Sequence, residues 1–133
     1  FPIGRLDKES EGLIIMTNDG RLTTKLLSHD TEKEYRVTVD KPLTHQFLTA
    51  LHQGVKIKIP TKSGKMRWYT TNPAKARRVD PTTFDIAITE GKNRQVRRMC
   101  AAYGYGVKKL VRVRIGDIEL RGLKSGQYRI LEK

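Results

Sequence analysis

The sequence predicts one α+β domain, built mainly from an antiparallel sheet with about three helices. Three observations support this fold class. Segments in which apolar and polar residues alternate recur along the chain, as in half-buried strands. Three other segments carry apolar residues at helical spacing, with residues that favour a helix start or end beside them. The length of 133 residues suits a single domain with a substantial core.

The first elements follow a charged loop near the N-terminus. Residues 13–16, Leu-Ile-Ile-Met, are apolar without interruption and predict a buried central strand. A turn follows, in which Asp19 is suited to cap a short helix. Leu22 and Leu26 would form the inward side of that helix.

Alternation predicts five further strands, at residues 34–40, 55–59, 83–89, 108–120 and 127–131. In the first of these, Tyr35 and Val37 lie on the inward side, and Pro42 follows the end of the strand. The polar and basic residues 60–81 contain glycine and proline, and we expect a hairpin or a pair of exposed strands there.

Two further helices are expected. Residues 44–53 form one, with Gly54 after its end. The other has Asn93 as its N-cap and Gly104 just past its C-terminus. Its apolar residues recur at i, i+3, i+4 and i+7 and form one stripe: Val96, Met99, Cys100 and Tyr103.

The composition narrows the class of partner. The chain has 27 Lys and Arg against 14 Asp and Glu, a net charge of +13. A folded basic domain suggests a polyanion such as nucleic acid, although charge that serves only solubility is an alternative. The single cysteine fits a reducing compartment, and no apolar run approaches the ~20 residues of a membrane span. We therefore expect a cytoplasmic protein that does not contact a membrane.

Several kinds of site are not favoured. His29, His45 and His52 have no cysteine or carboxylate partner at metal-ligand spacing. The sequence contains no phosphate-binding loop, dinucleotide fingerprint or serine elbow. Cys100 lies on the apolar stripe and is expected to pack in the core rather than act as a nucleophile. We expect neither a metal nor a cofactor.

One carboxylate stands out. Asp7 lies just ahead of the apolar run 13–16, where carboxylates usually have a partner or a function. On the last helix, Arg94 and Arg98 lie opposite the apolar stripe and should face solvent, whereas Arg97 lies at its border. A half-buried guanidinium favours a carboxylate partner, and Asp7 is suitable. Such a pair is either a structural salt bridge or, at a cleft, the holder of an ionised group for nucleophilic or base chemistry.

Four motifs occur in order along nearly the whole chain: GRLDKESEGLIIMTNDG, KEYRVTV, EGKNRQVRRM and LVRVRIGDIEL. They resemble the catalytic domain of bacterial ribosomal RNA pseudouridine synthases of the RsuA-type branch. FPIGRLDKES and KEYRVTVDKPLT are most similar to the RluF-like large-subunit enzymes. The resemblance implies the pseudouridine synthase catalytic-domain fold and an isomerase that needs no cofactor. Its substrate would be a specific uridine in ribosomal RNA, in the 23S ribosomal RNA of the large subunit.

The resemblance also implies roles for individual residues. Asp7 would be the catalytic aspartate, attacking the sugar or removing its 2′ proton. Tyr35 would stack on the flipped base, although its residue pattern alone favours a core tyrosine. Arg97 would pair with the aspartate. The uracil–ribose C–N bond would break, the base would rotate, and C5 would be joined to the same sugar.

RNA-binding roles follow from the same comparison. Arg5 would help to displace the uridine from the RNA stack and fill its place, and Leu110 would pack beside the base. Lys92, Arg94 and Arg98, in the last helix motif, are candidates for contacts to the RNA backbone, with a solvated charged face as the alternative.

Relatives usually carry an S4-type RNA-binding domain and a strand with an NKP-x-G pattern before GRLD. We expect residues 1–133 to be a single catalytic domain that lacks both. We expect a monomer. Its expected partner is ribosomal RNA, with transfer RNA as a further candidate. The alternative is a non-catalytic ribosome- or RNA-binding module, or an inactive fragment. That alternative explains the charge but not why Asp7, Tyr35 and Arg97 all occupy motif positions.

Overall fold

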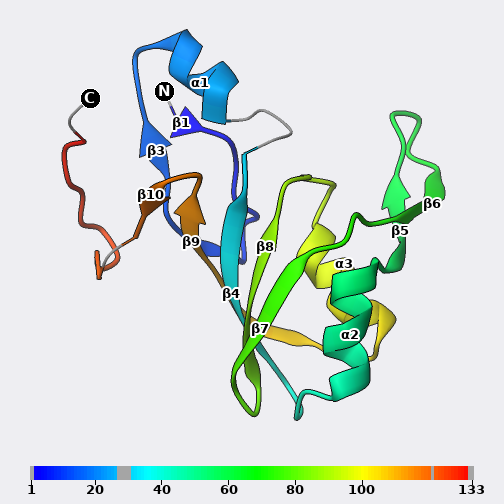
Figure 1. Cartoon of the computed structure of the whole chain (residues 1–133). Coiled ribbons are helices and arrows are strands. Elements are labelled where there is room, and N and C mark those ends of the chain that lie inside the picture. The colour runs from blue at the N-terminus through cyan, green and yellow to red at the C-terminus, as the bar shows by residue number, and fades with distance from the viewer. Residues whose placement is uncertain (1, 27–30, 121, 132–133) are drawn as a thin grey trace.

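The centre of the molecule is a strongly twisted sheet (Figure 1). The computed structural model describes residues 2–26, 31–120 and 122–131, and His29 lies outside them. Five strands run in the order β10-β9-β4-β8-β7, each antiparallel to its neighbours, and β2 pairs in parallel with β9. Their bounds are β2 (Glu11–Gly12), β4 (Lys33–Val39), β7 (Lys75–Asp80), β8 (Thr83–Ile88), β9 (Val107–Ile115) and β10 (Ile118–Glu119).

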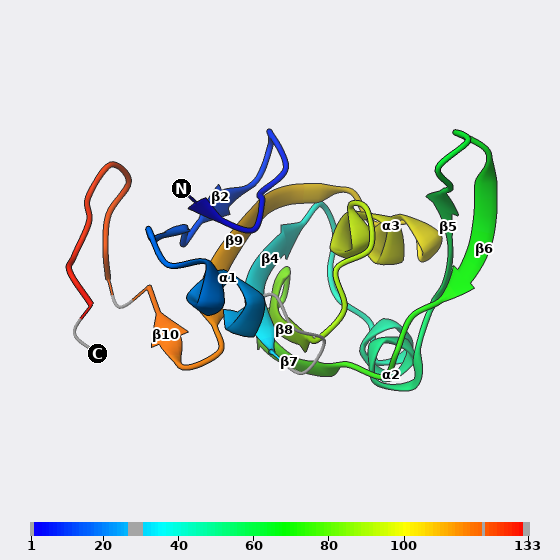
Figure 2. The same cartoon turned by 90° about the horizontal axis from the view of Figure 1, so that it is seen from above.

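The core lies between this sheet and two helices, α2 (His45–Gln53) and α3 (Gln95–Ala102), which cover one of its faces (Figure 2). The alternation in β4 places Val37 and Val39 in the core, as predicted. The helix α2 also forms as predicted, because the Thr44 hydroxyl accepts a hydrogen bond from the Phe47 N–H and Gly54 ends it. Within the described residues, no helix is both long and apolar enough to cross a membrane.

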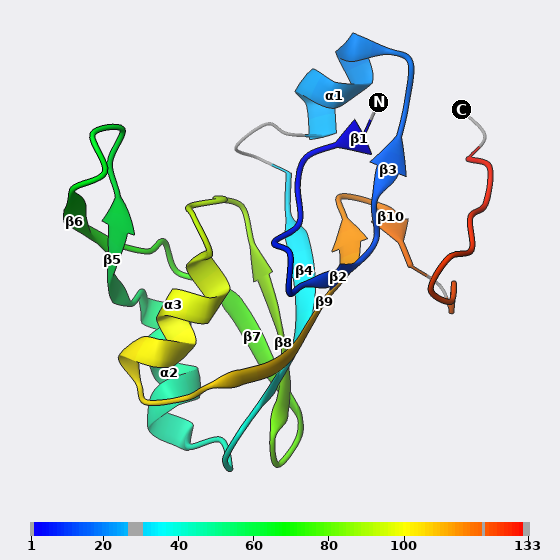
Figure 3. The same ribbon diagram turned by 180° about the vertical axis from the view of Figure 1, so that it is seen from behind.

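A separate hairpin projects from the edge of the molecule beside α3 (Figures 1 and 3). It consists of β5 (Lys56–Pro60) and β6 (Met66–Thr70), which pair antiparallel. The expectation of exposed strands within residues 60–81 is therefore confirmed, although β7 joins the main sheet beside β8. The hairpin is anchored through Ile57 and Ile59, which are buried.

The prediction for residues 13–16 is wrong. This segment contributes only the two-residue strand β3 (Ile15–Met16), which pairs with β1 (Pro2–Ile3) outside the main sheet. Ile14 and Met16 are 50% and 66% exposed, whereas Leu13 and Ile15 are buried. The buried side packs in a second small core with Leu26 of helix α1 (Gly20–Leu26). Among the described residues no layer covers the other side, whereas a central strand is covered on both faces. Helix α1 itself begins as predicted, since an Asp19 carboxylate oxygen accepts from the Arg21 N–H.

Two predictions in the second half of the chain also fail. Asn93 is not the N-cap of α3; that position is Arg94, in the left-handed conformation with φ 47° and ψ 38°. The Asn93 side chain instead accepts a hydrogen bond at Oδ1 from Arg98 Nη2, at 2.8 Å. Residues 127–131 form no strand in the described part of the chain, and Tyr128 and Ile130 are exposed. Alternation makes a strand only where a neighbouring strand supplies hydrogen-bond partners.

Candidate active site

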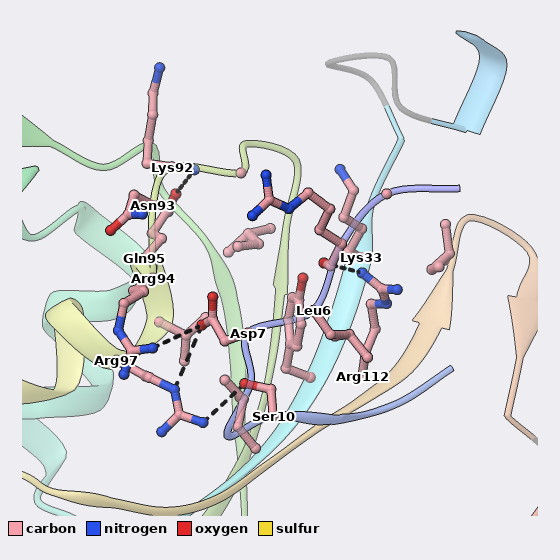
Figure 4. Close-up of a pocket in the computed structure, with 18 of the residues that line it drawn as sticks. Leu6, Asp7, Ser10, Lys33, Lys92, Asn93, Arg94, Gln95, Arg97 and Arg112 are labelled. Atoms are coloured by element: carbon pink, nitrogen blue, oxygen red, sulfur yellow. Dashed lines mark hydrogen bonds and ion pairs between the residues drawn. The ribbon is translucent and has the colours of Figure 1, made fainter. Parts of the chain in front are cut away.

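A pocket of about 640 Å³ lies where the N-terminal loop, the sheet and the start of α3 meet (Figure 4). Seven of the eight residues that the sequence singled out line it: Arg5, Asp7, Tyr35, Lys92, Arg94, Arg97 and Leu110. The eighth, Arg98, lies outside the lining and donates to the backbone and side-chain oxygens of Asn93. Residues far apart in the sequence are thus brought to one concave site.

Asp7 lies between two arginines at the start of α3. Its Oδ2 atom is 3.7 Å from Arg97 Nε and 3.9 Å from Arg94 Nη1. The loop that carries Asp7 closes on itself, because the Ser10 N–H donates to the Asp7 carbonyl. The predicted pairing of Asp7 with Arg97 is therefore present, beside an open pocket, and the contact with Arg94 is an addition to it.

The Arg97 side chain is more buried than that of Asp7. Its side chain is only 14% exposed, and Nη2 donates to Ser10 Oγ at 3.0 Å. Its Nε is buried and has no hydrogen-bond partner within the described residues. The guanidinium is therefore fixed at one end by Ser10, while its Nε faces the Asp7 carboxylate.

Arg94 does not face solvent as predicted. Its left-handed backbone, which costs about 1 kcal/mol for a residue with a side chain, turns the guanidinium toward the N-terminal loop. There Nη1 donates to Glu9 Oε2 at 2.9 Å. This hydrogen bond, with the arginine charge, lowers the pKa of Glu9. A helical wheel missed this arrangement because Arg94 precedes the first helical turn.

The sheet supplies further residues to the pocket lining. Tyr35 comes from β4 and Leu110 from the neighbouring strand β9, where Leu110 is buried. Burial raises the pKa of the Tyr35 hydroxyl above its ordinary value, which already lies well above physiological pH. An aromatic ring and an aliphatic side chain thus line the same pocket as the charged cluster.

Sequence reasoning missed Arg112, which is buried and lines the same pocket. Its Nε and Nη2 both donate to the Leu13 carbonyl, at 2.9 and 2.8 Å, and Nη1 donates to the Arg5 carbonyl at 3.3 Å. Arg112 therefore holds the Asp7 loop at both ends. The sequence could have indicated this position, because Arg112 follows Leu110 by two residues on a strand and such residues share a face.

Lys33 was also missed. It lines the pocket, and burial, together with the nearby charge of Arg112, lowers its pKa. Lys92, by contrast, extends away from Asp7 (Figure 4), and its ammonium lies 5.0 Å from the centre of the Tyr69 ring. Cys100 is fully buried, and burial raises its pKa to about 12, as expected for a packing residue.

Residues 1–102 match the family model described as RNA pseudouridylate synthase. The chain belongs to this family. The RsuA-type, RluF-like assignment and the α+β fold made from the sequence are confirmed by its relatives.

Among the relatives of this pseudouridylate synthase family member is the dual-specificity RNA pseudouridine synthase RluF of Escherichia coli (strain K12). The two are 47% identical over 133 residues, which is 98% of this chain and 43% of that protein. The ribosomal large subunit pseudouridine synthase E of Xanthomonas campestris is 38% identical, over 98% of this chain and 76% of that protein. A solved structure, a crystal structure of pseudouridylate synthase, superposes with a TM-score of 0.84 at 35% identity. The superposition covers 98% of this chain and 55% of the chain in that structure. The chain thus spans less than half the length of the RluF relative.

Within the described residues of this family member, no group of three His, Cys, Asp or Glu side chains could hold a metal ion. The chemistry available in the pocket is that of one carboxylate close to two guanidinium groups, with a phenol in the same lining. Such a carboxylate can act as a nucleophile or a base.

Proposed function

We propose that this chain is the catalytic part of an RNA pseudouridine synthase that isomerises a specific uridine of ribosomal RNA. The observation that carries the proposal is the position of Asp7, within 4 Å of Arg97 and Arg94 at a pocket with an aromatic and an aliphatic wall, in a chain of this family. A purely RNA-binding module would not need this arrangement.

In this proposal each pocket residue has a task. Asp7 acts on the sugar or its 2′ proton while the C–N bond of uridine breaks, and Arg97, 3.7 Å away, holds the carboxylate in place. Tyr35 stacks on the flipped base and Leu110 packs beside it, so that the base stays bound while it rotates. Arg5, exposed at the rim, takes the place of the base in the RNA stack. Flipping costs a few kcal/mol, which contacts to phosphates from Lys92, Arg94 and Arg98 help to offset.

The substrate is proposed from chemistry and charge. The net charge of +13 favours an extended polyanion, and the relatives named as large-subunit enzymes point to 23S ribosomal RNA. Transfer RNA is the second RNA to test. The enzyme would act as a cytoplasmic monomer. It would need no cofactor, because the rearrangement moves one bond within one nucleotide.

The test follows release of the C5 proton as tritium from unmodified 23S ribosomal RNA that carries [5-³H]uridine. The wild type should release tritium and Asp7→Asn should not. Asp117→Asn is the matched control, since this exposed carboxylate lies outside the pocket and should leave the rate unchanged. Full activity of Asp7→Asn would refute the assigned role. RNA binding by the wild type without any release would favour the binding module.

A further inference from the structure

The β5–β6 hairpin has no role in the chemistry proposed above, yet its composition is unusual. Residues 55–72 contain five basic side chains and no aspartate or glutamate: Lys56, Lys58, Lys62, Lys65 and Arg67. The hairpin projects from the molecule (Figure 2), so these charges are presented to solvent. A projecting basic hairpin offers a surface for a polyanion.

The outer face of this hairpin carries an exposed tryptophan. Trp68 is 57% exposed, and Met66 beside it on the same face is also exposed. Lys58 lies directly opposite Trp68 in the strand register. The ammonium groups of Lys56 and Lys58 both lie 4.9 Å from the centre of the indole ring. An aromatic ring that borders solvent between cations is the combination with which proteins bind unpaired nucleotides.

The inner face of the hairpin, which carries Tyr69, is hydrogen-bonded to a residue next to the pocket lining. The Tyr69 hydroxyl donates to Oε1 of Glu90, and the Asn72 N–H donates to Oε2 of the same carboxylate at 2.7 Å. Glu90 is buried, and it directly precedes the segment, residues 91–97, that lines the pocket. Lys92 of that segment lies over the Tyr69 ring. The inner face of the hairpin therefore borders the segment that lines the pocket, and an RNA longer than the nucleotide in the pocket has to pass around the hairpin to reach its outer face.

We propose that the outer face of the β5–β6 hairpin, formed by Lys56, Lys58, Met66 and Trp68, is a second RNA-binding surface. It holds an unpaired nucleotide of the substrate RNA outside the pocket. The base stacks on the indole, and the two lysines turn from the ring to the adjacent phosphates. Charge selects this occupant over a protein, because no carboxylate in the hairpin balances its five cations. The inference rests on the proposed function, since it assumes that the pocket binds RNA.

The position of Trp68 makes the test direct, because it is the one tryptophan of the sequence. An unmodified 23S ribosomal RNA transcript is titrated into the Asp7→Asn chain, which should bind RNA without turning it over. Stacking should quench the tryptophan emission, and the titration should follow the binding curve measured independently with fluorescein-labelled transcript. An emission that stays constant at saturating RNA would overturn the proposal.

Variants separate stacking from charge. Trp68→Leu should weaken binding of the transcript about tenfold, since stacking of one base contributes about 1–3 kcal/mol, whereas Trp68→Phe should retain most of the affinity. Lys56→Ala with Lys58→Ala should lower the slope of log K against log salt by about 1.4, the value for two phosphates of a single strand. Thermal unfolding checks that each variant is folded.

The outcomes distinguish the two proposals. If the variants bind RNA and release tritium like the wild type, the hairpin proposal is wrong and a protein becomes the candidate occupant, while the proposed function stands. If the wild type binds no RNA and releases no tritium, both are wrong. Weaker binding in Trp68→Leu, with tritium release restored at saturating enzyme, supports both.

Discussion

One guanidinium group joins the loop of Asp7 to helix α3. Arg97 Nε lies 3.7 Å from Asp7 Oδ2, while Nη2 of the same group donates to Ser10 Oγ at 3.0 Å. A planar fork directs separate nitrogens at the two partners in a fixed geometry, whereas an ammonium has one nitrogen on a flexible stem. The guanidinium therefore connects the carboxylate to the Ser10 hydroxyl in a fixed geometry, and the first prediction follows from this arrangement.

Arg97→Lys keeps the charge beside Asp7 but loses the rigid fork that directs separate nitrogens at Asp7 and Ser10. We expect the single-turnover rate of tritium release to fall about 100-fold, comparable to the loss of one electrostatic contact at a reacting centre. Ser10→Ala removes only the supporting hydrogen bond and should cost about tenfold or less. Arg21→Lys, at an arginine exposed to solvent and paired only with Asp19 among the described residues, is the control. An unchanged rate in Arg97→Lys would show that direction does not matter.

Gly12 allows the N-terminal loop to lie against β9. Its φ is 125°, and a Cβ there would overlap the backbone N and O atoms of Arg112. Gly12→Ala should therefore lower the free energy of unfolding by about 3 kcal/mol or more, through backbone strain and this overlap together. Gly64→Ala separates the two causes, because Gly64 has a φ of 86° but open space around it. It should cost only about 1 kcal/mol. Equal losses in urea denaturation would contradict the close approach of Gly12 to Arg112.

Asp85 makes stability depend on acid pH. Its side chain is 6% exposed and contacts Arg36 at 2.9 Å and Arg77 at 3.2 Å. Burial alone would raise the pKa of this carboxyl, but hydrogen bonds from the two arginines outweigh it and the pKa is lowered. The stabilisation is then fully present above the unfolded pKa of about 3.9 and is lost as the pH falls through the lower folded value.

Replacing Asp85 with asparagine should reduce the free energy of unfolding at pH 7 by about 1–3 kcal/mol. The difference between wild type and variant should shrink as the pH falls below about 4. Urea denaturation at a series of pH values measures it. Asp117→Asn should leave the curve unchanged. A constant difference down to pH 2 would show that the ion pair does not cause the effect.

The hydrogen bond from Tyr69 to Glu90 makes stability depend on alkaline pH. That bond, followed by burial, raises the pKa of Tyr69 to about 12. The stabilisation is therefore complete below the unfolded value of about 10 and is lost as the pH rises through 12. Tyr69→Phe should lower the free energy of unfolding by about 1–2 kcal/mol at pH 8, with a smaller difference above pH 10. Tyr128→Phe, at an exposed tyrosine, is the control. A pH-independent difference would contradict a neutral phenol as the donor.

Local patterns predicted the elements that depend on local interactions. Helix α2 forms where its spacing and the Thr44 cap indicated, and β4 forms where Val37 and Val39 alternate with polar residues. The Asp7–Arg97 contact was also within reach, because a border position on a helix restricts which side chain can face a partner. The failures share one cause. The structure of residues 13–16, Asn93, Arg94 and residues 127–131 depends on what lies opposite them in space.

By itself, the sequence determined the fold class, the family and the chemical character of the pocket, because periodicity, capping residues and ordered motifs are properties of neighbours along the chain. Only the tertiary structure decided that Arg112 is buried as the support of the Asp7 loop, that Arg94 turns toward Glu9, and that Glu90 joins the hairpin to the pocket. A polar group becomes buried only where distant segments supply its hydrogen-bond partners. Alternation and spacing record no such partners, since they describe one segment at a time.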